Sequence, residues 1–165
     1  MKKFVALLLA VLMVASLCAC GQKDTGSDLQ TVTKGKLIMS TNAEFAPYEY
    51  VADDGKGFQG TGYEGIDIEI AYALAQKLGL ELVVDNMDFD AALSAVQTGK
   101  SDMVAAGVTV TPDRLNAMSF TDSYANGVQV VIVKEGSDIK SIDDLQGKKI
   151  GTQRGTTGYI YCSDD

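Results

Sequence analysis

Residues 105–114 combine groups that could hold the carboxylate of a small molecule. The segment reads Ala-Ala-Gly-Val-Thr-Val-Thr-Pro-Asp-Arg. Arg114 carries a planar fork of N–H donors that matches a carboxylate, and its charge persists at physiological pH. Gly107 lets a ligand approach the backbone closely, while Thr109 adds a hydroxyl and an N–H group. We therefore predict a carboxylate site here, with Gly107 and Thr109 available to a neighbouring amino group; the alternative is a capped helix with a surface arginine.

The same segment predicts the helix that positions Arg114. Thr111 can cap a helix, Pro112 suits its first position, and Asp113 favours its positive end. A buried strand over residues 102–106 is expected to lead into it. Arg114 would then lie in the first turn of a short helix just beyond a strand end.

Strands and helices alternate along the chain, which predicts an α/β fold with a parallel sheet and ligands at the strand ends. The predicted strands are 36–40, 81–85, 102–106 and 127–134, and the predicted helices are 66–78 and 89–98. The first helix is expected to bury the face formed by Ile66, Ile70, Ala73, Leu74 and Leu78. A Gly-rich surface loop or hairpin is expected over 53–64. After residue 134 a new unit is expected, with a capped helical turn at 141–145, a strand at 148–152 and a helix opening at 155–158.

The N-terminus predicts export. Lys2 and Lys3 precede an apolar run over residues 4–14 that is too short for an ordinary membrane span. The run leads into Leu17-Cys18-Ala19-Cys20, which resembles the bacterial lipobox. We predict a signal peptide over 1–19, lipidation at Cys20 and a flexible tether over 20–35, with a plain secretory signal as the alternative. The protein would then be anchored by lipid to the outer face of the cytoplasmic membrane, or be periplasmic.

Composition argues against several other classes of function. The formal net charge of −8 disfavours nucleic acid and anionic membrane surfaces as partners. The chain has no histidine and no cysteine cluster, so no metal site is expected, and Cys162 would have no disulfide partner. The glycines within residues 60–65 fit G-x-G-x-x-G, but no buried strand precedes them and acidic residues follow, so no dinucleotide cofactor is expected.

Eight short motifs, in order, give the chain a family resemblance. From residue 36 onward the sequence resembles the N-terminal part of the family-3 extracellular solute-binding proteins, the amino-acid receptors of bacterial ABC importers. The motifs are FAPYE (45–49), GIDIEIA (65–71), MDFD (87–90), GKSD (99–102), AGVTVTPDR (106–114), FTDSY (120–124), DLQGKK (144–149) and GTTG (155–158).

The resemblance implies a periplasmic-binding-protein-like fold of type II, in which two α/β lobes close over the ligand. Lobe one would occupy residues 36–124, and residues 125–134 would form the strand that crosses the hinge. Lobe two would begin at 135, and the chain would stop within it, at residue 165. Whether the 165 residues fold or bind alone is left open.

The resemblance also implies a role for individual residues. Arg114 would pair with the α-carboxylate of an amino acid, helped by the backbone N–H groups of Thr109 and Thr157, while the Gly107 carbonyl and the Thr109 hydroxyl would accept from its α-ammonium group. Phe45 and Phe89 would sandwich the ligand side chain. The remaining expected ligand contacts are Asn42 from lobe one and Gln153, Thr156 and Thr157 from lobe two.

One departure from the family affects the choice of ligand. Asn42 occupies a position that is often aspartate in the family, and its neutral amide cannot pair with a cationic ligand side chain. Glu44 is a neighbouring candidate for that pairing, so the charge preference stays open.

The function predicted from the sequence is a monomeric, membrane-tethered receptor rather than an enzyme, with no cofactor. It would capture an amino acid, polar or cationic ones being favoured, and deliver it to a transporter permease. One alternative is a dehydratase-like enzyme on the same fold, with Glu44, Asp88 or Asp90 as the general acid or base. Another is a surface lipoprotein that senses its ligand and signals to a protein partner.

Overall fold

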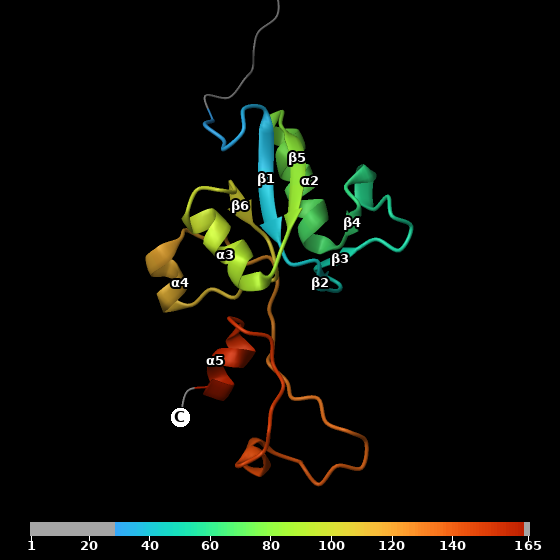
Figure 1. Ribbon diagram of the computed structural model, residues 1–165, viewed down its shortest axis with the longest axis vertical. Helices are drawn as coiled ribbons and strands as arrows, with labels where there is room; N and C mark the ends of the chain where they lie inside the picture. Colours follow the sequence, from blue (N-terminus) through green and yellow to red (C-terminus); the bar gives the residue numbers. More distant parts are fainter. Residues whose placement is uncertain (1–28, 164–165) are drawn as a thin grey trace, which may run out of the picture.

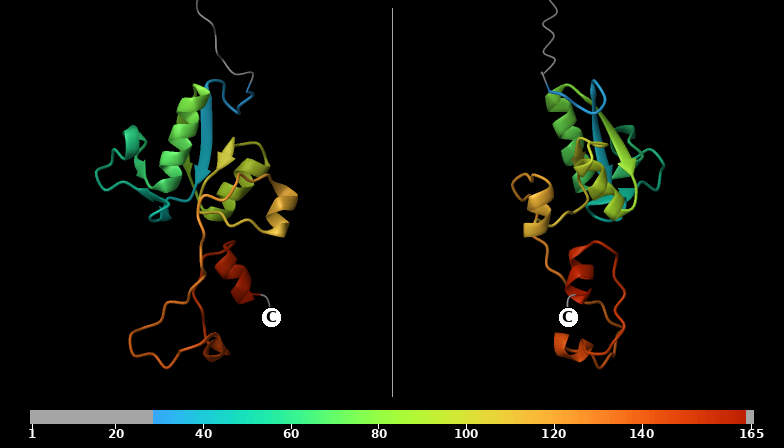
Figure 2. Two further views of the ribbon diagram at one scale, coloured as in Figure 1. Left: turned by 180° about the vertical axis from the view of Figure 1, so that it is seen from behind. Right: turned by 60° about the vertical axis from the view of Figure 1, so that its left-hand side comes forward.

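The computed structural model describes residues 29–163. The predicted signal peptide, the lipidation at Cys20 and the tether up to residue 28 lie outside the described residues. Figure 1 shows the elements from β1 to α4 in one larger body, with the orange and red part of the chain extending from it through a narrow connection. The same two parts are seen from behind and from the side in Figure 2.

A three-stranded parallel sheet forms the centre of the larger body. It consists of β1 (Lys36–Thr41), β5 (Glu81–Asn86) and β6 (Met103–Val104), in the order β5-β1-β6. The central strand β1 pairs over its whole length with β5, and Met39 and Ser40 of β1 also pair with β6. All three strands match strands predicted from the sequence. Their carboxyl ends lie at one edge of the sheet, where Figure 1 shows the connection to the second part.

Two helices cover the faces of this sheet. Helix α2 (Ile66–Leu78) leads from β1 toward β5, and α3 (Phe89–Gln97) leads from β5 across β1 to β6. Because right-handed crossovers in opposite directions leave a sheet on opposite sides, the two helices lie on opposite faces. The core between β1 and α2 is formed by Met39, Ile68 and Ala71. The short helix α4 (Pro112–Ala117) follows β6.

The face that α2 buries differs from the predicted one. The predicted face was Ile66, Ile70, Ala73, Leu74 and Leu78, but the residues buried are Asp67, Ile68, Ala71 and Ala75. The large residues Ile66, Ile70 and Leu74 stay exposed. Small alanine side chains let the helix axis approach the sheet closely, so this alanine face packs inward although its periodic signal is weaker than that of the isoleucines and leucines.

A small antiparallel sheet is attached beside the N-terminus of α2. Its strands are β2 (Glu44–Phe45), β3 (Glu49–Val51) and β4 (Tyr63–Glu64), in that order, and the short 3-10 helix η1 (Phe58–Gly60) lies between β3 and β4. The loop or hairpin expected over 53–64 is therefore a hairpin. This sheet carries Phe45 and Glu49 to the carboxyl end of β1.

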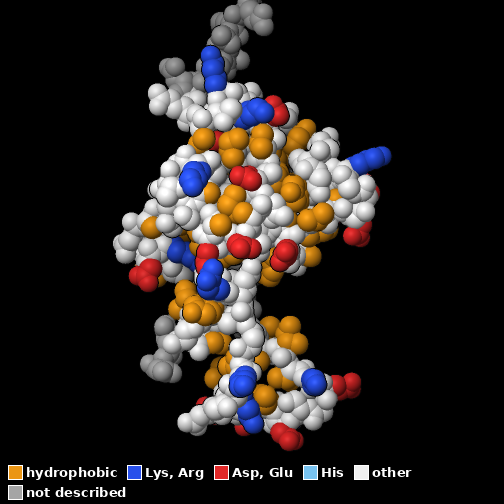
Figure 3. Space-filling model, viewed as in Figure 1, with side chains coloured by type: hydrophobic (Ala, Val, Ile, Leu, Met, Phe, Trp, Pro, Cys, Tyr) orange, Lys and Arg blue, Asp and Glu red, His pale blue; other side chains and the backbone are white. Residues whose placement is uncertain are grey.

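The second part of the chain contains less regular structure than predicted. It has η2 (Ile142–Leu145), which Ser141 and Asp144 cap reciprocally, and α5 (Thr157–Ser163), both as expected. The strands predicted at 127–134 and 148–152 are absent. A β-branched run forms a strand only where a neighbouring strand pairs with it, and no such partner occurs among the described residues. Ile132 is 93% exposed, and Figure 3 shows apolar side chains gathered on this part.

No helix within residues 29–163 is long and apolar enough to cross a membrane.

Candidate functional site

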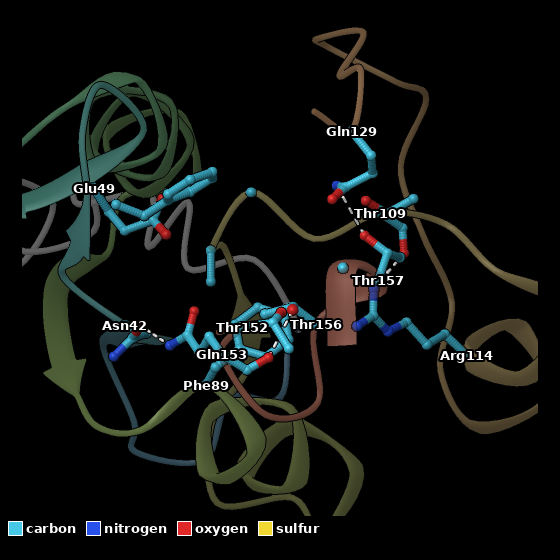
Figure 4. Close-up of a pocket in the computed structure, with 14 residues that line it drawn as sticks. Asn42, Glu49, Phe89, Thr109, Arg114, Gln129, Thr152, Gln153, Thr156 and Thr157 are labelled. Carbon is cyan, nitrogen blue, oxygen red and sulfur yellow. Dashed lines mark hydrogen bonds between the residues drawn. The ribbon is translucent and has the colours of Figure 1, made fainter. Parts of the chain in front are cut away.

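A cavity of about 220 Å³ lies where the three parallel strands end (Figure 4). Asn42 follows β1, Phe89 opens the helix after β5, and Gly107 follows β6, so each strand delivers one wall residue. The cavity is lined by all nine residues predicted to contact a ligand: Asn42, Phe45, Phe89, Gly107, Thr109, Arg114, Gln153, Thr156 and Thr157. Five further residues line it that the sequence did not single out: Glu49, Ala106, Gln129, Thr152 and Gly158.

Arg114 is a buried residue of this cavity rather than a surface arginine. It lies in the first turn of α4, where its backbone N–H donates to the Thr111 hydroxyl, and its exposed fraction is 9%. Nη1 donates to the Thr109 carbonyl at 2.7 Å, and Nη2 donates to the Gly155 carbonyl at 2.9 Å. Its Cζ lies 5.5 Å from the centre of the Phe89 ring.

The electrostatics of Arg114 favour an anion beside it. Burial lowers the pKa of the guanidinium, yet an arginine stays protonated in proteins. A guanidinium has five N–H donors, and the two bonds to carbonyls leave three of them for a further acceptor. Arg114 is also one of only two ionisable residues that line the cavity among the described residues, the other being Glu49. A partly desolvated cation with free donors is a suitable partner for a carboxylate.

Gly107 has a backbone that only glycine adopts readily. Its φ is +53°, in the left-handed region, and its N–H donates to Oδ2 of Asp67 at 2.8 Å. A Cβ at this position would lie 2.9 Å from Cε1 of Phe45. The wall formed by Gly107 and Phe45 is therefore tightly packed, and Asp67 fixes its backbone from behind.

The two predicted aromatic walls differ in their surroundings. Phe45 is half-exposed and stacks on Tyr48, with ring centres 5.3 Å apart and planes 14° apart. Phe89 is buried. It lies in the first turn of α3, and the guanidinium of Arg114 lies over its ring. Phe89 thus both packs against the protein and lines the cavity.

Asn42 links the two parts of the chain. Its Oδ1 accepts a hydrogen bond from Nε2 of Gln153 at 2.9 Å, and its Nδ2 donates to the Met87 carbonyl at 3.0 Å. Both ends of the amide are therefore engaged within the protein. Glu44, the candidate for pairing with a cationic ligand, is exposed and does not line the cavity.

Two of the lining threonines of the second part, Thr156 and Thr157, lie at the start of α5. Thr157 is buried, and its hydroxyl accepts a hydrogen bond from Nε2 of Gln129 at 3.1 Å. The Thr156 hydroxyl donates to the Gln153 carbonyl at 2.7 Å. Figure 4 shows Gln129, Thr109, Thr157 and Arg114 on one side of the cavity, so both parts of the chain contribute to that side.

A buried pair of carboxyl groups was missed by reasoning from the sequence. Glu49 and Asp67 are each 1% exposed, and Oε2 of Glu49 and Oδ1 of Asp67 have no hydrogen-bond partner among the described residues. Burial, and then repulsion from Asp67, raises the pKa of Glu49 to about 9. The sequence offered only the presence of Glu49 in the motif at 45–49 and of Asp67 in the motif at 65–71 as a hint of this pair. Their burial depends on how these two separate segments pack together.

No group of three or more potential metal-ligating side chains occurs within residues 29–163. Cys162 is exposed and carries a free thiol.

Comparison with known proteins identifies the family. Residues 37–158 match the model of the bacterial extracellular solute-binding proteins, family 3. The chain belongs to this family. The family resemblance predicted from the motifs is therefore confirmed.

Solute-binding relatives of known or assigned ligand are similar over most of this chain. The arginine-binding extracellular protein ArtP of Bacillus subtilis is 38% identical over 156 residues, which cover 94% of this chain and 57% of ArtP. A probable histidine-binding protein of Neisseria gonorrhoeae is 36% identical over 165 residues, which cover 99% of this chain and 59% of that protein. The chain thus spans little more than half the length of these relatives.

Solved structures confirm the predicted fold class. A mutant of arginine-bound ArgBP from T. maritima has a TM-score of 0.71 and 34% identity, over 78% of this chain and 59% of that one. An ancestral arginine-binding protein bound to arginine has a TM-score of 0.70 and 40% identity, over 78% of this chain and 54% of that one. This chain therefore has the solute-binding fold of type II, and it corresponds to part of that fold.

Proposed function

We propose that this solute-binding protein is the receptor of an ABC importer and captures a free amino acid, with a cationic side chain favoured. The α-carboxylate lies on Arg114, and the α-ammonium group is held by the Gly107 carbonyl and the Thr109 hydroxyl. The ligand side chain lies between Phe45 and Phe89. The proposal rests above all on one observation, which is that a buried Arg114 with three unused N–H donors opens into a cavity lined by both parts of the chain.

The preference for a cationic side chain has two supports. The relatives named above include arginine-binding proteins and a probable histidine-binding protein. The cavity also contains a carboxyl group, on Glu49, in addition to the cation on Arg114. A zwitterion with an extra positive charge would find partners for each of its charges in such a cavity.

Binding is proposed to close the two lobes, after which the receptor passes the amino acid to a permease. The contacts of Arg114 with Gly155 and of Asn42 with Gln153 already join the two parts, so a ligand held between them would favour the closed arrangement. Lipidation at Cys20 is proposed to hold the monomeric receptor at the outer face of the cell membrane. Its function is proposed to be capture rather than catalysis.

Binding can be tested by thermal unfolding of the full-length gene product with a panel of L-amino acids, followed by calorimetry with those that raise the Tm. We expect cationic amino acids to give the largest shifts. A panel in which no amino acid changes the Tm or gives binding heat would contradict the proposal.

Transport can be tested separately, by uptake of the labelled amino acid in cells with and without the gene. We expect uptake to be lost on deletion and restored by the parent gene. Restoration by an Arg114→Met variant that has lost binding would contradict the role of this site in transport.

A further inference from the structure

Asp67 is a buried carboxyl group directly behind one wall of the cavity. It is the second residue of α2, it is 1% exposed, and it does not itself line the cavity. Its Oδ2 accepts the N–H of Gly107 at 2.8 Å, and its Oδ1 has no hydrogen-bond partner among the described residues. Since Gly107 lines the cavity, Asp67 is separated from a ligand there by one layer of backbone.

Asp67 also ties the aromatic wall to the Gly107 backbone. Its N–H donates to the Tyr48 carbonyl at 2.9 Å, and the Tyr48 ring stacks on that of Phe45. Gly107 has a φ of +53° and packs so tightly that a Cβ there would lie 2.9 Å from Cε1 of Phe45. One residue therefore holds both the left-handed backbone of Gly107 and its spacing from the aromatic wall.

The negative charge of the buried carboxyl pair resides on Asp67 in the empty cavity. Two adjacent buried carboxyl groups rarely both ionise. Burial, and then repulsion from Asp67, raises the pKa of Glu49 to about 9, so Glu49 holds a proton at neutral pH. Asp67 accepts the Gly107 N–H and lies in the first turn of α2, where the helix dipole favours a negative charge. Tyr124 beside the pair is a neutral hydroxyl, because burial, and then Asp67, raises its pKa.

The α-ammonium group of a bound amino acid requires a negative charge nearby. In the proposed arrangement it contacts the Gly107 carbonyl and the Thr109 hydroxyl, which are both neutral acceptors. Taking an ammonium ion out of water against neutral groups alone is costly. Asp67 is bonded to the backbone of Gly107, the same residue that the ammonium group would contact. Its charge is therefore placed to offset that cost.

We propose that Asp67 is the positioning residue of the α-ammonium site. It holds the Gly107 backbone in place and supplies, from behind the wall, the negative charge that stabilises the ammonium group. The inference rests on the proposed function and adds the source of its amino-group recognition. Asp67 keeps its charge in both the empty and the occupied cavity, so this recognition transfers no proton.

L-Arginine and 5-guanidinopentanoate are the matched probes, because they share the carboxylate and the guanidinium side chain and differ in the α-amino group. Calorimetry on the full-length gene product, with competition for the weaker probe, gives both affinities. We expect the parent protein to bind arginine at least about tenfold more tightly. For a receptor that takes another cationic amino acid, the corresponding pairs are L-lysine with 6-aminohexanoate and L-histidine with imidazolepropionate.

Two variants make the same chemical change at different places. Asp67→Asn keeps an oxygen for the Gly107 N–H but removes the charge. It should lower the affinity for arginine about tenfold or more, and that for the analogue less than about threefold. Asp102→Asn is the matched control, because Asp102 also accepts backbone N–H groups but precedes β6, at the end of the sheet away from the cavity. It should leave the ratio of the two affinities unchanged, and thermal unfolding reports whether each variant is folded.

The charge of Asp67 can also be measured in the parent protein, without any variant. Carbon-13 NMR of the assigned Asp67 carboxyl group should show a carboxylate at pH 7, both with and without arginine. A protonated Asp67 in either state would overturn the inference.

The possible outcomes separate this inference from the proposed function. In folded Asp67→Asn, an equal loss of affinity for both probes would make Asp67 a merely structural residue, and an unchanged arginine affinity would give it no part in binding. Either result, or equal affinities of the parent for the two probes, would overturn the inference and leave the receptor function intact. Binding of no amino acid by the parent would overturn both.

Discussion

Replacing Arg114 by lysine keeps the charge of the site and removes its fork of donors. Two N–H donors of Arg114 are bonded to the Thr109 and Gly155 carbonyls, which leaves three for a ligand. A lysine ammonium has three donors in all, so one remains if both carbonyls are still satisfied. The carboxylate would then be held by one hydrogen bond instead of two.

The loss of one charge-assisted hydrogen bond sets the expected magnitude. We expect Arg114→Lys to weaken amino-acid binding by about 1.5–3 kcal/mol, or about 10- to 150-fold in Kd. Arg114→Ala should weaken it by about 2–5 kcal/mol, because the carboxylate then lies desolvated without a partner.

Calorimetry on the full-length gene product measures both effects, and Arg154→Lys is the matched control. Arg154 is the other arginine of the sequence, and it pairs with Asp90 at 3.1 Å at the surface. Its replacement should leave Kd within about twofold, because exposed ion pairs contribute little. If folded Arg114→Lys bound as tightly as the parent protein, the assignment of Arg114 to the carboxylate would be wrong.

Three further variants test the scaffold around the site. Gly107→Ala should lower the free energy of unfolding by about 1–3 kcal/mol in urea titrations and weaken binding, because φ is +53° and the added Cβ meets Phe45. Asp102→Asn should cost about 1–3 kcal/mol in the same assay, because each carboxylate oxygen accepts a backbone N–H at 2.7 Å. Glu49→Gln should stabilise the ligand-free protein more at pH 8 than at pH 5. The pKa of Glu49 is about 9 in the folded protein against an ordinary 4.5, so the folded protein binds this proton more tightly than the unfolded chain does. The stability that this proton binding contributes is complete below pH 4.5 and is lost as the pH rises toward 9. Equal effects at the two pH values would contradict that assignment.

The sequence predicted the elements that carry the site because their signals are local. Strand β1 and helix α3 are short periodic segments bounded by polar or glycine residues, and Thr111 and Pro112 mark the start of α4 directly. Seven of the nine predicted lining residues lie within the family motifs, and Asn42 and Gln153 lie between them. Their role in binding remains a prediction.

The features that the sequence did not predict depend on contacts between distant segments. The predicted inward face of α2 was wrong, because the close packing of Ala71 and Ala75 against the sheet outweighed the burial of the larger Ile70 and Leu74. The prediction of a strand at 127–134 was wrong, because a strand requires a neighbouring strand to pair with and the described residues offer none there. The buried pair of Glu49 and Asp67 was missed because burial depends on how separate segments pack in the folded protein.

A crystal structure of the full-length gene product with the amino acid that raises its Tm most would test the site directly. We predict that the α-carboxylate lies within hydrogen-bonding distance of two nitrogens of Arg114, with the ligand side chain between Phe45 and Phe89. A ligand whose carboxylate is held elsewhere, or one that binds outside this cavity, would contradict the proposed function.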